Sequence, residues 1–356
     1  MKRQIVSIDK MASMNALWNA WIKISSGDGK DKRPDVIAYG EHLDENLARL
    51  AAALLAGTWQ PDKGHTTWIY TENKWRMIHI VNVETRLVYQ LLVDAFKFKR
   101  LFVGRTFGAI KGRGTLRASK QVRRDLYRHP ELDYVIKTDF HHYYQSIIKQ
   151  RLMDMVCRKY KGRAALELLE RCLAAYNIGE PVSISIGAVT SQDLGNLYLT
   201  PIDRFILEEL KMSCLARLVD DTVILCRRED GARVIPRLKE KAKELGLEYG
   251  RIEFFPVSDR RIDFCGWAVN RTNVRVRQST LHRYRRRLHC MQKHPERINR
   301  TMSVVGSYDG ILKFADTYKL NKQIHKNYDE VFARIHGYAA YKRRRERVSV
   351  PPAAGR

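Results

Sequence analysis

Apolar residues recur at helical spacing in two early parts of the chain. Leucines between residues 43 and 56 repeat every three or four positions, and Gly57 follows them as a stop signal. The same periodicity returns over residues 84–98. These patterns predict two helices, the first of them inside a helical N-terminal extension that covers residues 1–60.

Runs of apolar and β-branched residues predict strands further along. Residues 66–70 and 76–81 flank a short polar segment, which is typical of a hairpin. Residues 134–139 form a short apolar run that ends in a carboxylate. Residues 215–219 and 222–226 form another pair of runs, and these two meet at adjacent aspartates. Each run is short enough to be one strand of a small sheet.

Helical patterns occupy most of the remaining chain. Two further short strands are predicted near residues 254–255 and 264–267, and the pattern after about residue 270 is helical and basic. Residues 341–356 are predicted to be a disordered tail. The other helices are predicted at residues 119–127, 149–176, 193–210 and 232–245.

The charge of the chain is strongly positive and unevenly distributed. Its 356 residues include 65 Lys and Arg but only 39 Asp and Glu, a formal net charge of +26. The surplus gathers around residues 111–124, 271–293 and 342–347. Because 44% of the residues are apolar, the composition is that of a globular protein and not of a disordered basic tail. We therefore expect a polyanionic partner, most often nucleic acid; the alternative is a generally basic surface.

Length, hydropathy and cysteine usage set the broad class. A chain of 356 residues suits two or three domains. It contains no run of 18 apolar residues and no secretory signal pattern, so we expect no membrane segment. Its 6 cysteines are scattered and form no C-x-x-C pair, which favours reduced core residues over a disulfide frame or a zinc site. A cytoplasmic protein is the expectation.

Three aspartates stand where strands end or meet. Asp139 ends one predicted strand, and Asp220 and Asp221 lie between two others. Nucleotidyl transfer uses two Mg²⁺ ions about 4 Å apart, which clamp the attacking and leaving oxygens. Mg²⁺ prefers carboxylate, phosphate and water oxygens. The trio therefore suggests this chemistry, although acidic residues are also ordinary in hairpin turns.

Other residues that such an enzyme needs occur around the trio. Tyr144 lies five residues after Asp139, where an aromatic ring can wall off the sugar. Lys74 and Arg76 on the early hairpin can reach a triphosphate. Gln192 opens a predicted helix whose N-terminus can face a nucleotide. Each has an ordinary alternative, as a core aromatic, a solvated turn or a first-turn helix residue.

The order of these motifs resembles that of a reverse transcriptase. The resemblance covers roughly residues 33–325, most of the chain. The segments that carry it are residues 75–78 (the fingers hairpin), 105–117 (the segment before the palm), 137–144 (the first metal motif), 218–221 (the Asp-Asp box), 263–267 (the primer-grip turn) and 307–320 (the thumb helix).

One segment narrows the resemblance to a subfamily. Residues 186–192 read I-G-A-V-T-S-Q, where most reverse transcriptases carry Q-G-x-x-x-S-P. The I-G-x-x-x-S-Q pattern resembles the enzymes of diversity-generating retroelements, within the group II intron-like bacterial and phage reverse transcriptases. The resemblance implies a polymerase that copies a template-repeat RNA into cDNA, with misincorporation opposite adenines. It also implies a small basic accessory protein that forms an oligomeric barrel.

The resemblance implies an α/β (α+β) fold of the right-hand polymerase type. The expected palm is a small antiparallel sheet covered by helices. After the N-terminal extension, the expected regions are fingers at residues 61–130, a palm at 131–270 with a fingers-type insertion at about 150–190, a basic helical thumb at 271–340 and the tail.

It also implies roles for individual residues. Asp139 and Asp220 are expected to bind two Mg²⁺ ions, with Mn²⁺ as a substitute, helped by the Phe140 carbonyl, and Asp221 is expected to support metal or primer geometry. The dNTP pocket is expected to comprise Lys74, Arg76, His141, Tyr143, Tyr144, Ile186 and Gln192. The residues expected to contact the primer, the template or the RNA/cDNA duplex are Leu218, Gly266, Trp267, Arg113, Arg283 and Arg286.

Two positions depart from the usual pattern. Ile186 replaces a glutamine, and its side chain can make no hydrogen bond. We hypothesise that the polymerase therefore discriminates less well between correct and incorrect base pairs, and that Ile186 and Arg76 together set its fidelity at template adenines. Leu218 replaces an aromatic residue that normally packs beside the primer end.

Three alternatives to this subfamily remain open at the level of sequence. The chain can be another small bacterial reverse transcriptase, of the retron, defence-linked or CRISPR-associated kind. It can be a catalytically idle, maturase-like RNA-binding protein. It can also be a basic scaffold that carries these motifs by coincidence.

Overall fold

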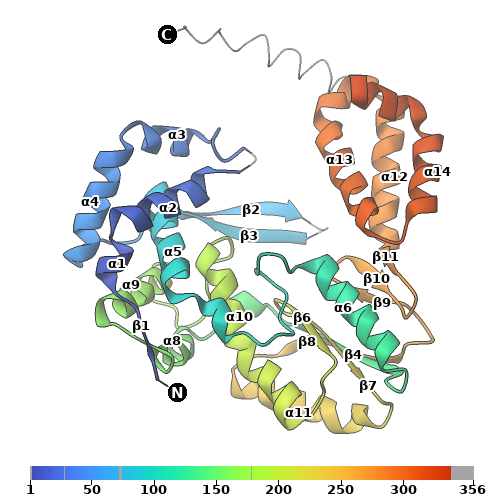
Figure 1. The fold of residues 1–356 in the computed structure, drawn as a ribbon, viewed down its shortest axis with the longest axis horizontal. Coiled ribbons are helices and arrows are strands. Elements are labelled where there is room, and N and C mark those ends of the chain that lie inside the picture. The colour runs from blue at the N-terminus through green and yellow to red at the C-terminus, as the bar shows by residue number, and fades with distance from the viewer. Residues whose placement is uncertain (1, 28, 72–73, 178, 338–356) are drawn as a thin grey trace. The chain divides into compact units, whose positions relative to one another are not determined.

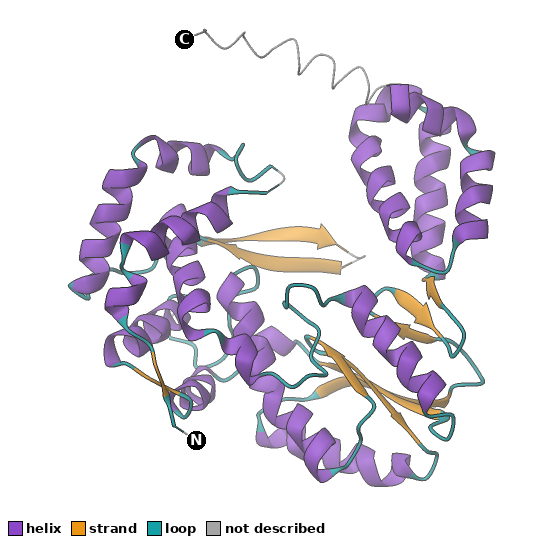
Figure 2. Ribbon diagram, in the orientation of Figure 1, coloured by secondary structure: helices purple, strands orange, loops and turns teal. Residues whose placement is uncertain are grey.

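The computed structural model describes residues 2–27, 29–71, 74–177 and 179–337. The chain divides into two compact units, each of which is described by itself. Residues 1–114 and 134–255 make up the first unit, and residues 115–133 and 256 onward make up the second. This division differs from the predicted regions, since the predicted fingers segment contributes to both units. Figure 2 shows the mixture of helices and strands in each.

The first unit begins with short helices that share one core. Ser7 and Ser13 cap the first two by accepting hydrogen bonds from backbone N–H groups of the first turn. Leu47, Leu50 and Leu54 of the fourth helix are buried, as their spacing predicts. The helices are α1 (Ile8–Met11), α2 (Met14–Ser25), α3 (Pro34–Glu41) and α4 (Leu43–Leu55), and they are drawn in blue in Figure 1.

The predicted hairpin follows and is anchored at its base. Strands β2 (His65–Thr71) and β3 (Lys74–Ile80) pair antiparallel, with Tyr70 opposite Trp75. At the base, the buried His79 ring bonds the Ser185 hydroxyl at 3.2 Å and the Lys63 carbonyl at 2.7 Å. The predicted helix at 84–98 then appears as α5 (Val83–Phe96), capped by Asn82 and followed by the 3-10 turn η1 (Phe98–Leu101).

The first unit contains a four-stranded sheet. Its order is β6-β7-β4-β8, and both β6 and β4 run antiparallel to β7. The alternation of side chains sends Ile136 and Ile224 to one face, where they join the core formed by the helices of this unit. The strands are β4 (Tyr134–Phe140), β6 (Leu215–Leu218), β7 (Asp221–Cys226) and β8 (Tyr249–Pro256).

Helix α10 (Val189–Arg204) is the most buried of the described helices in the first unit. Its apolar residues Leu194 and Tyr198 are fully buried, and so are its polar residues Asn196 and Asp203. A helix that is buried on most sides must pair its polar groups internally. The remaining elements of this unit are α7 (Tyr143–Ser146), α8 (Lys149–Cys157), α9 (Arg163–Ala174), the π-helical turn η2 (Phe205–Glu209), α11 (Asp230–Glu244) and the parallel pair β1 (Gln4–Ile5) and β5 (Tyr160–Lys161).

The second unit combines a small sheet with helices. Its basic helix α6 (Thr115–Arg128) packs against the sheet, and the buried Ser119 hydroxyl donates to the Phe264 carbonyl at 3.3 Å. Helices α12, α13 and α14 pack in sequence, as Figure 1 shows in orange and red. The other elements are β9 (Ile262–Phe264), β10 (Trp267–Val269), β11 (Val274–Val276), α12 (Gln278–Lys293), the 3-10 turn η3 (Pro295–Arg297), α13 (Ile298–Phe314) and α14 (Tyr318–Asn327).

The structure confirms the coarse fold class and most of the predicted elements. The fold is mixed α and β, and its sheets of three and four strands are small. Strand β11 was not predicted, since the pattern after residue 270 indicated only helix. The predicted tail at 341–356 lies outside the described residues. No helix in the described part of the chain is both long and apolar enough to cross a membrane.

Candidate active site

The sheet brings together aspartates that are far apart in the sequence. Thr138 of β4 pairs with Thr222 of β7, so Asp139 and Asp221 occupy the next position of the ladder. Both side chains leave the face opposite to the two buried threonines. Asp220 lies in the two-residue turn that joins β6 to β7. Asp139 is exposed, whereas Asp220 and Asp221 are half-buried.

The charges of these neighbouring carboxylates act on one another. Burial, together with the negative charges of Asp139 and Asp221, raises the pKa of Asp220 to about 6. Carboxylates crowded in this way repel one another at neutral pH, and a bound cation would relieve the repulsion. The negative charge of this turn therefore destabilises the metal-free folded protein at neutral pH.

The described residues do not form a ready-made metal cage. Among them, no group of three or more His, Cys, Asp and Glu side chains is arranged to hold an ion. The chemistry of the donors still fits Mg²⁺, because this ion is usually bound through one or two carboxylates plus substrate phosphates and water. The Phe140 side chain has no oxygen, so only its backbone carbonyl is a potential ligand.

Both predicted tyrosines feel the charge of Asp220, and Tyr144 is the less buried of the two. Its ring lies against Gly195 of α10, where an added Cβ would be 3.3 Å from its Cε1 atom. Burial raises the pKa of Tyr144 to about 12, and the charge of Asp220 adds to the effect. Tyr143, which was also predicted to contact the nucleotide, is buried. Tyr143 is only 3% exposed, because its ring packs in the core and its hydroxyl donates to the Gly195 carbonyl.

Ile186 lies between the hairpin and the segment that follows β4. Its carbonyl accepts a hydrogen bond from the His79 N–H of β3 at 2.9 Å. Two residues earlier, the Ile184 N–H donates to the Tyr144 carbonyl at 3.0 Å. The Ile186 side chain is half-buried. The backbone therefore connects three of the predicted nucleotide-pocket segments in one unit.

The other residues predicted to contact the nucleotide are exposed, except Lys74, whose side chain is not described. Arg76 is exposed on β3, and Gln192 is exposed in the first turn of α10. His141 is exposed, with its ring centroid 4.1 Å from that of His142. Lys74 begins β3, but its side chain lies outside the described part of the structure.

The predicted primer and template residues are divided between the two units. In the first unit, Leu218 is half-buried on the same face as Asp221, its partner in the ladder. Arg113 is exposed, but its Nη1 atom donates to the carbonyls of Gly104 at 3.1 Å and Thr106 at 2.8 Å. It therefore holds its own loop together, and it retains other donor atoms.

In the second unit, Gly266 and Cys265 form the two-residue turn between β9 and β10, both with positive φ. Trp267, which was predicted to contact nucleic acid, is buried. Trp267 is 6% exposed, because it faces the inside of this unit. Arg286 is exposed on α12, whereas Arg283 is half-buried and donates to Thr280 of its own helix at 3.4 Å.

The sequence reading missed several charged residues that lie inside the first unit. Arg217 of β6 is 1% exposed and is paired with Asp203 of α10. Asp193 is 2% exposed, and burial raises its pKa to about 6 despite Lys99 at 3.5 Å. One signal was available, since Arg217 interrupts an otherwise apolar strand.

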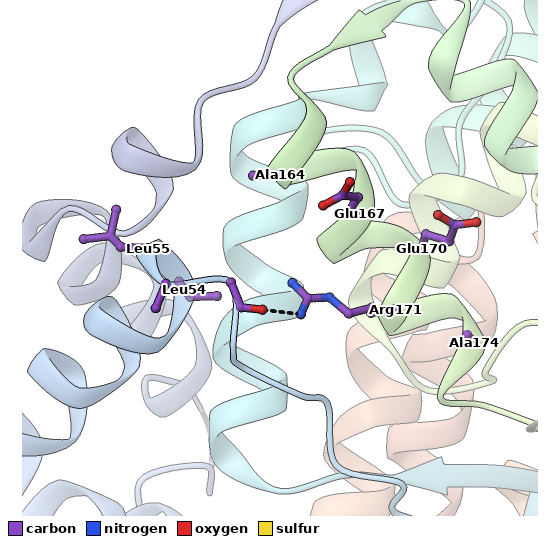
Figure 3. Close-up of a pocket in the computed structure, with 9 residues that line it drawn as sticks. Leu54, Leu55, Ala164, Glu167, Glu170, Arg171 and Ala174 are labelled. Atoms are coloured by element: carbon purple, nitrogen blue, oxygen red, sulfur yellow. Dashed lines mark hydrogen bonds between the residues drawn. The ribbon is translucent and has the colours of Figure 1, made fainter.

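A groove of about 710 Å³ occurs elsewhere in the first unit, between the end of α4 and the helix α9. Arg171 crosses it and donates to the Gly57 carbonyl at 2.7 Å, as the dashed line in Figure 3 shows. Glu167 and Glu170 point from α9 on one side, and Leu54 and Leu55 lie on the other (Figure 3). None of the predicted site residues lines this groove.

Comparison with known proteins adds no assignment. No protein-family model matches the chain, and no curated protein matches it.

Proposed function

We propose that the chain is an RNA-directed DNA polymerase that works by two-metal nucleotidyl transfer. The observation that carries the proposal is the meeting of Asp139 with Asp220 and Asp221 at one end of an antiparallel sheet. Asp139 comes from β4, Asp221 from the start of β7 and Asp220 from the turn before it, and the raised pKa of Asp220 indicates that their charges are crowded. Crowded carboxylates at a strand end are common to sites that handle phosphates through Mg²⁺.

The residues of the chain would divide the work as follows. Asp139 and Asp220 would hold Mg²⁺, with Mn²⁺ as a substitute, and the Phe140 carbonyl and Asp221 would support them. The bound ions would stabilise the charge that develops on the attacking and leaving oxygens. Arg76, with Lys74, would bind the triphosphate, and Tyr144 would border the sugar.

The proposal extends to the diversity-generating type, on the strength of Ile186. Its backbone is fixed by the bond to His79, and its side chain offers no hydrogen bond to a nucleotide. A pocket with fewer fixed polar contacts would discriminate base pairs less well. The template would then be a template-repeat RNA, copied with errors at adenines, with a small basic accessory protein as partner.

Primer extension with purified protein tests the polymerase proposal. The wild type should extend a DNA primer on an RNA template only when Mg²⁺ or Mn²⁺ is present. Asp220→Asn should lower the rate by about a thousandfold, since loss of a metal ligand removes several kcal/mol of transition-state stabilisation. Binding of the template–primer duplex should be nearly unchanged.

Asp154→Asn is the matched control, because Asp154 is an exposed aspartate on α8 of the same unit. It should extend primers like the wild type. If the wild type binds RNA but extends no primer with any divalent ion, the enzyme proposal is wrong and an RNA-binding role replaces it.

A further inference from the structure

We infer that Arg217 is a positioning residue for the aspartate turn. Asp203 of α10 holds the Arg217 guanidinium, and the guanidinium donates a hydrogen bond to the Val219 carbonyl. This bond restrains the backbone of the turn and so sets the position and direction of the Asp220 side chain. The inference deepens the proposed function and rests on it, because it assigns to a buried ion pair the task of orienting a metal-binding carboxylate.

The first step is the contact between Arg217 and Asp203. The Arg217 Nε atom donates to Asp203 Oδ1 at 2.7 Å, and Nη2 donates to Oδ2 at 2.5 Å. The two side chains are 2% and 0% exposed, respectively. This is a bidentate, fully desolvated pair between β6 and α10, so the plane of the guanidinium has one orientation.

The guanidinium also donates to groups other than Asp203. Its Nη1 atom donates to the Val219 carbonyl at 2.7 Å and to Asn196 Oδ1 at 2.9 Å. Its Nη2 atom also reaches the Thr106 hydroxyl at 3.3 Å. The donor directions of Arg217 are thus all used, and one of them ends on the residue that precedes Asp220.

Val219, the residue before Asp220, has an unusual backbone conformation. Val219 has φ of +58°, in the left-handed region that β-branched residues rarely adopt. Glycine is the usual residue at such a turn position. A valine remains there only if its surroundings hold it, and the Arg217 donor to its carbonyl is such a restraint.

A second restraint acts on the other side of Val219. Gly108 lies so close that an added Cβ would be 2.9 Å from the Val219 nitrogen. Gly108 itself is held by Asn196, whose Nδ2 donates to its carbonyl at 3.1 Å. The Phe107 N–H also donates to the Arg217 carbonyl at 2.8 Å. The turn is therefore clamped from two sides, and Asn196 joins both clamps.

Stability alone does not account for this arrangement. A buried ion pair is often replaced by apolar residues of similar size without loss of stability, because desolvation offsets the attraction. What apolar residues cannot replace is the donor to the Val219 carbonyl. A lysine cannot replace it either, since one ammonium cannot hold Asp203 in two places and reach Val219 as well.

The test uses the double variant Arg217→Met with Asp203→Leu, which leaves no buried charge unpaired. Two quantities are measured on the full chain: Mn²⁺ affinity by electron paramagnetic resonance, and the Mg²⁺ concentration at half-maximal primer extension. We expect the double variant to fold and to bind template–primer, with Mn²⁺ affinity weaker by about 10- to 100-fold, the usual effect of losing a residue that orients a ligand. The KM for dNTP should change little.

Tyr198→Phe is the matched control. It removes a buried hydrogen bond from the same helix, from the Tyr198 hydroxyl to the Leu245 carbonyl at 2.6 Å, and does not touch the turn. Its Mn²⁺ affinity should equal that of the wild type. Arg217→Lys should behave like the double variant in metal binding if it folds.

The possible outcomes separate the inference from the proposed function. Equal Mn²⁺ affinity in the double variant and the wild type overturns the inference, and so does a wild type that binds no Mn²⁺. If the wild type binds Mn²⁺, the double variant binds it more weakly and neither extends primers, the inference stands and the polymerase proposal fails.

Discussion

The environment of Asp220 disfavours the ionised carboxylate that the proposed metal binding requires. Burial and the neighbouring aspartates raise its pKa to about 6, so ionisation of this carboxyl is less favourable in the folded protein than in the unfolded chain. A carboxyl whose pKa is raised on folding contributes stability at low pH, and this contribution is lost as pH rises through the folded pKa. At neutral pH the ionised side chain therefore destabilises the metal-free fold.

Asp220→Asn should consequently stabilise the metal-free protein near pH 7. In EDTA its melting temperature should exceed that of the wild type, and the difference should shrink as pH falls from about 7 to about 4. Mg²⁺ should raise the melting temperature of the wild type more than that of the variant, since a ligand stabilises only the state that binds it.

Thermal unfolding across this pH range is the measurement, with the exposed-site variant Asp154→Asn as the control. A melting temperature of Asp220→Asn at or below that of the wild type in EDTA near pH 7 would contradict the charge-crowding explanation.

At the scale of elements, the β2–β3 hairpin has two chemically different faces. Trp68, Tyr70 and Trp75 are exposed by 62%, 60% and 64%. The register places them on one face, and the Tyr70 and Trp75 ring centroids are 5.3 Å apart. Arg76 belongs to the other face, since successive residues of a strand alternate. Exposed aromatic rings of this size suit stacking with unpaired bases.

If the proposed function holds, Trp75→Ala should weaken binding of a single-stranded template overhang by about 5- to 100-fold, the range found for one stacked base. Arg76→Ala should instead raise the KM for dNTP and leave overhang binding nearly unchanged. Fluorescence anisotropy with overhangs of different length measures the first effect, and steady-state kinetics the second.

Trp18→Ala is the control, because Trp18 is an exposed tryptophan, at 39%, on α2 of the same unit. An overhang affinity that falls equally in the Trp18 and Trp75 variants would rule out a specific role for the hairpin.

At the scale of the whole molecule, the net charge of +26 is the dominant property. Part of it lies on described helix surfaces: Arg117, Lys120 and Arg124 are exposed along one side of α6. Residues at this spacing form one face of a helix. Such a face can follow a phosphate backbone, so binding of RNA should release counterions.

RNA affinity should therefore fall steeply with salt, by about a thousandfold between ~50 and ~200 mM if about six phosphates are contacted. The pair Lys120→Gln and Arg124→Gln should reduce the slope of log affinity against log salt by about one to two. Filter binding over a salt series measures both. Affinity that is insensitive to salt would show that the surplus charge does not contact RNA.

The order and type of the elements could be predicted from the sequence, because they depend on local patterns. Leucine spacing located α4, and the two apolar runs around a polar turn located the β2–β3 hairpin. Strand β11 was missed because its three residues lie among many basic ones and show almost no alternation.

The surroundings of individual site residues could not be predicted, because these depend on distant segments. Tyr143 and Tyr144 are adjacent and alike in the sequence, yet the first is enclosed by the core and bonded to Gly195, whereas the second is only partly buried. Trp267 is buried for the same kind of reason.

The sequence by itself located the ends of these strands to within one residue, and hence indicated that Asp139, Asp220 and Asp221 are candidates for one site. Strand periodicity and turn position are properties of a few consecutive residues, so they can be read locally. Only the tertiary structure decided that β4 pairs with β7, and that Asp203 and Asn196 of α10 lie against Arg217 beside the turn. Burial and pairing of charge arise when segments from different parts of the chain pack together, and no local pattern records that packing.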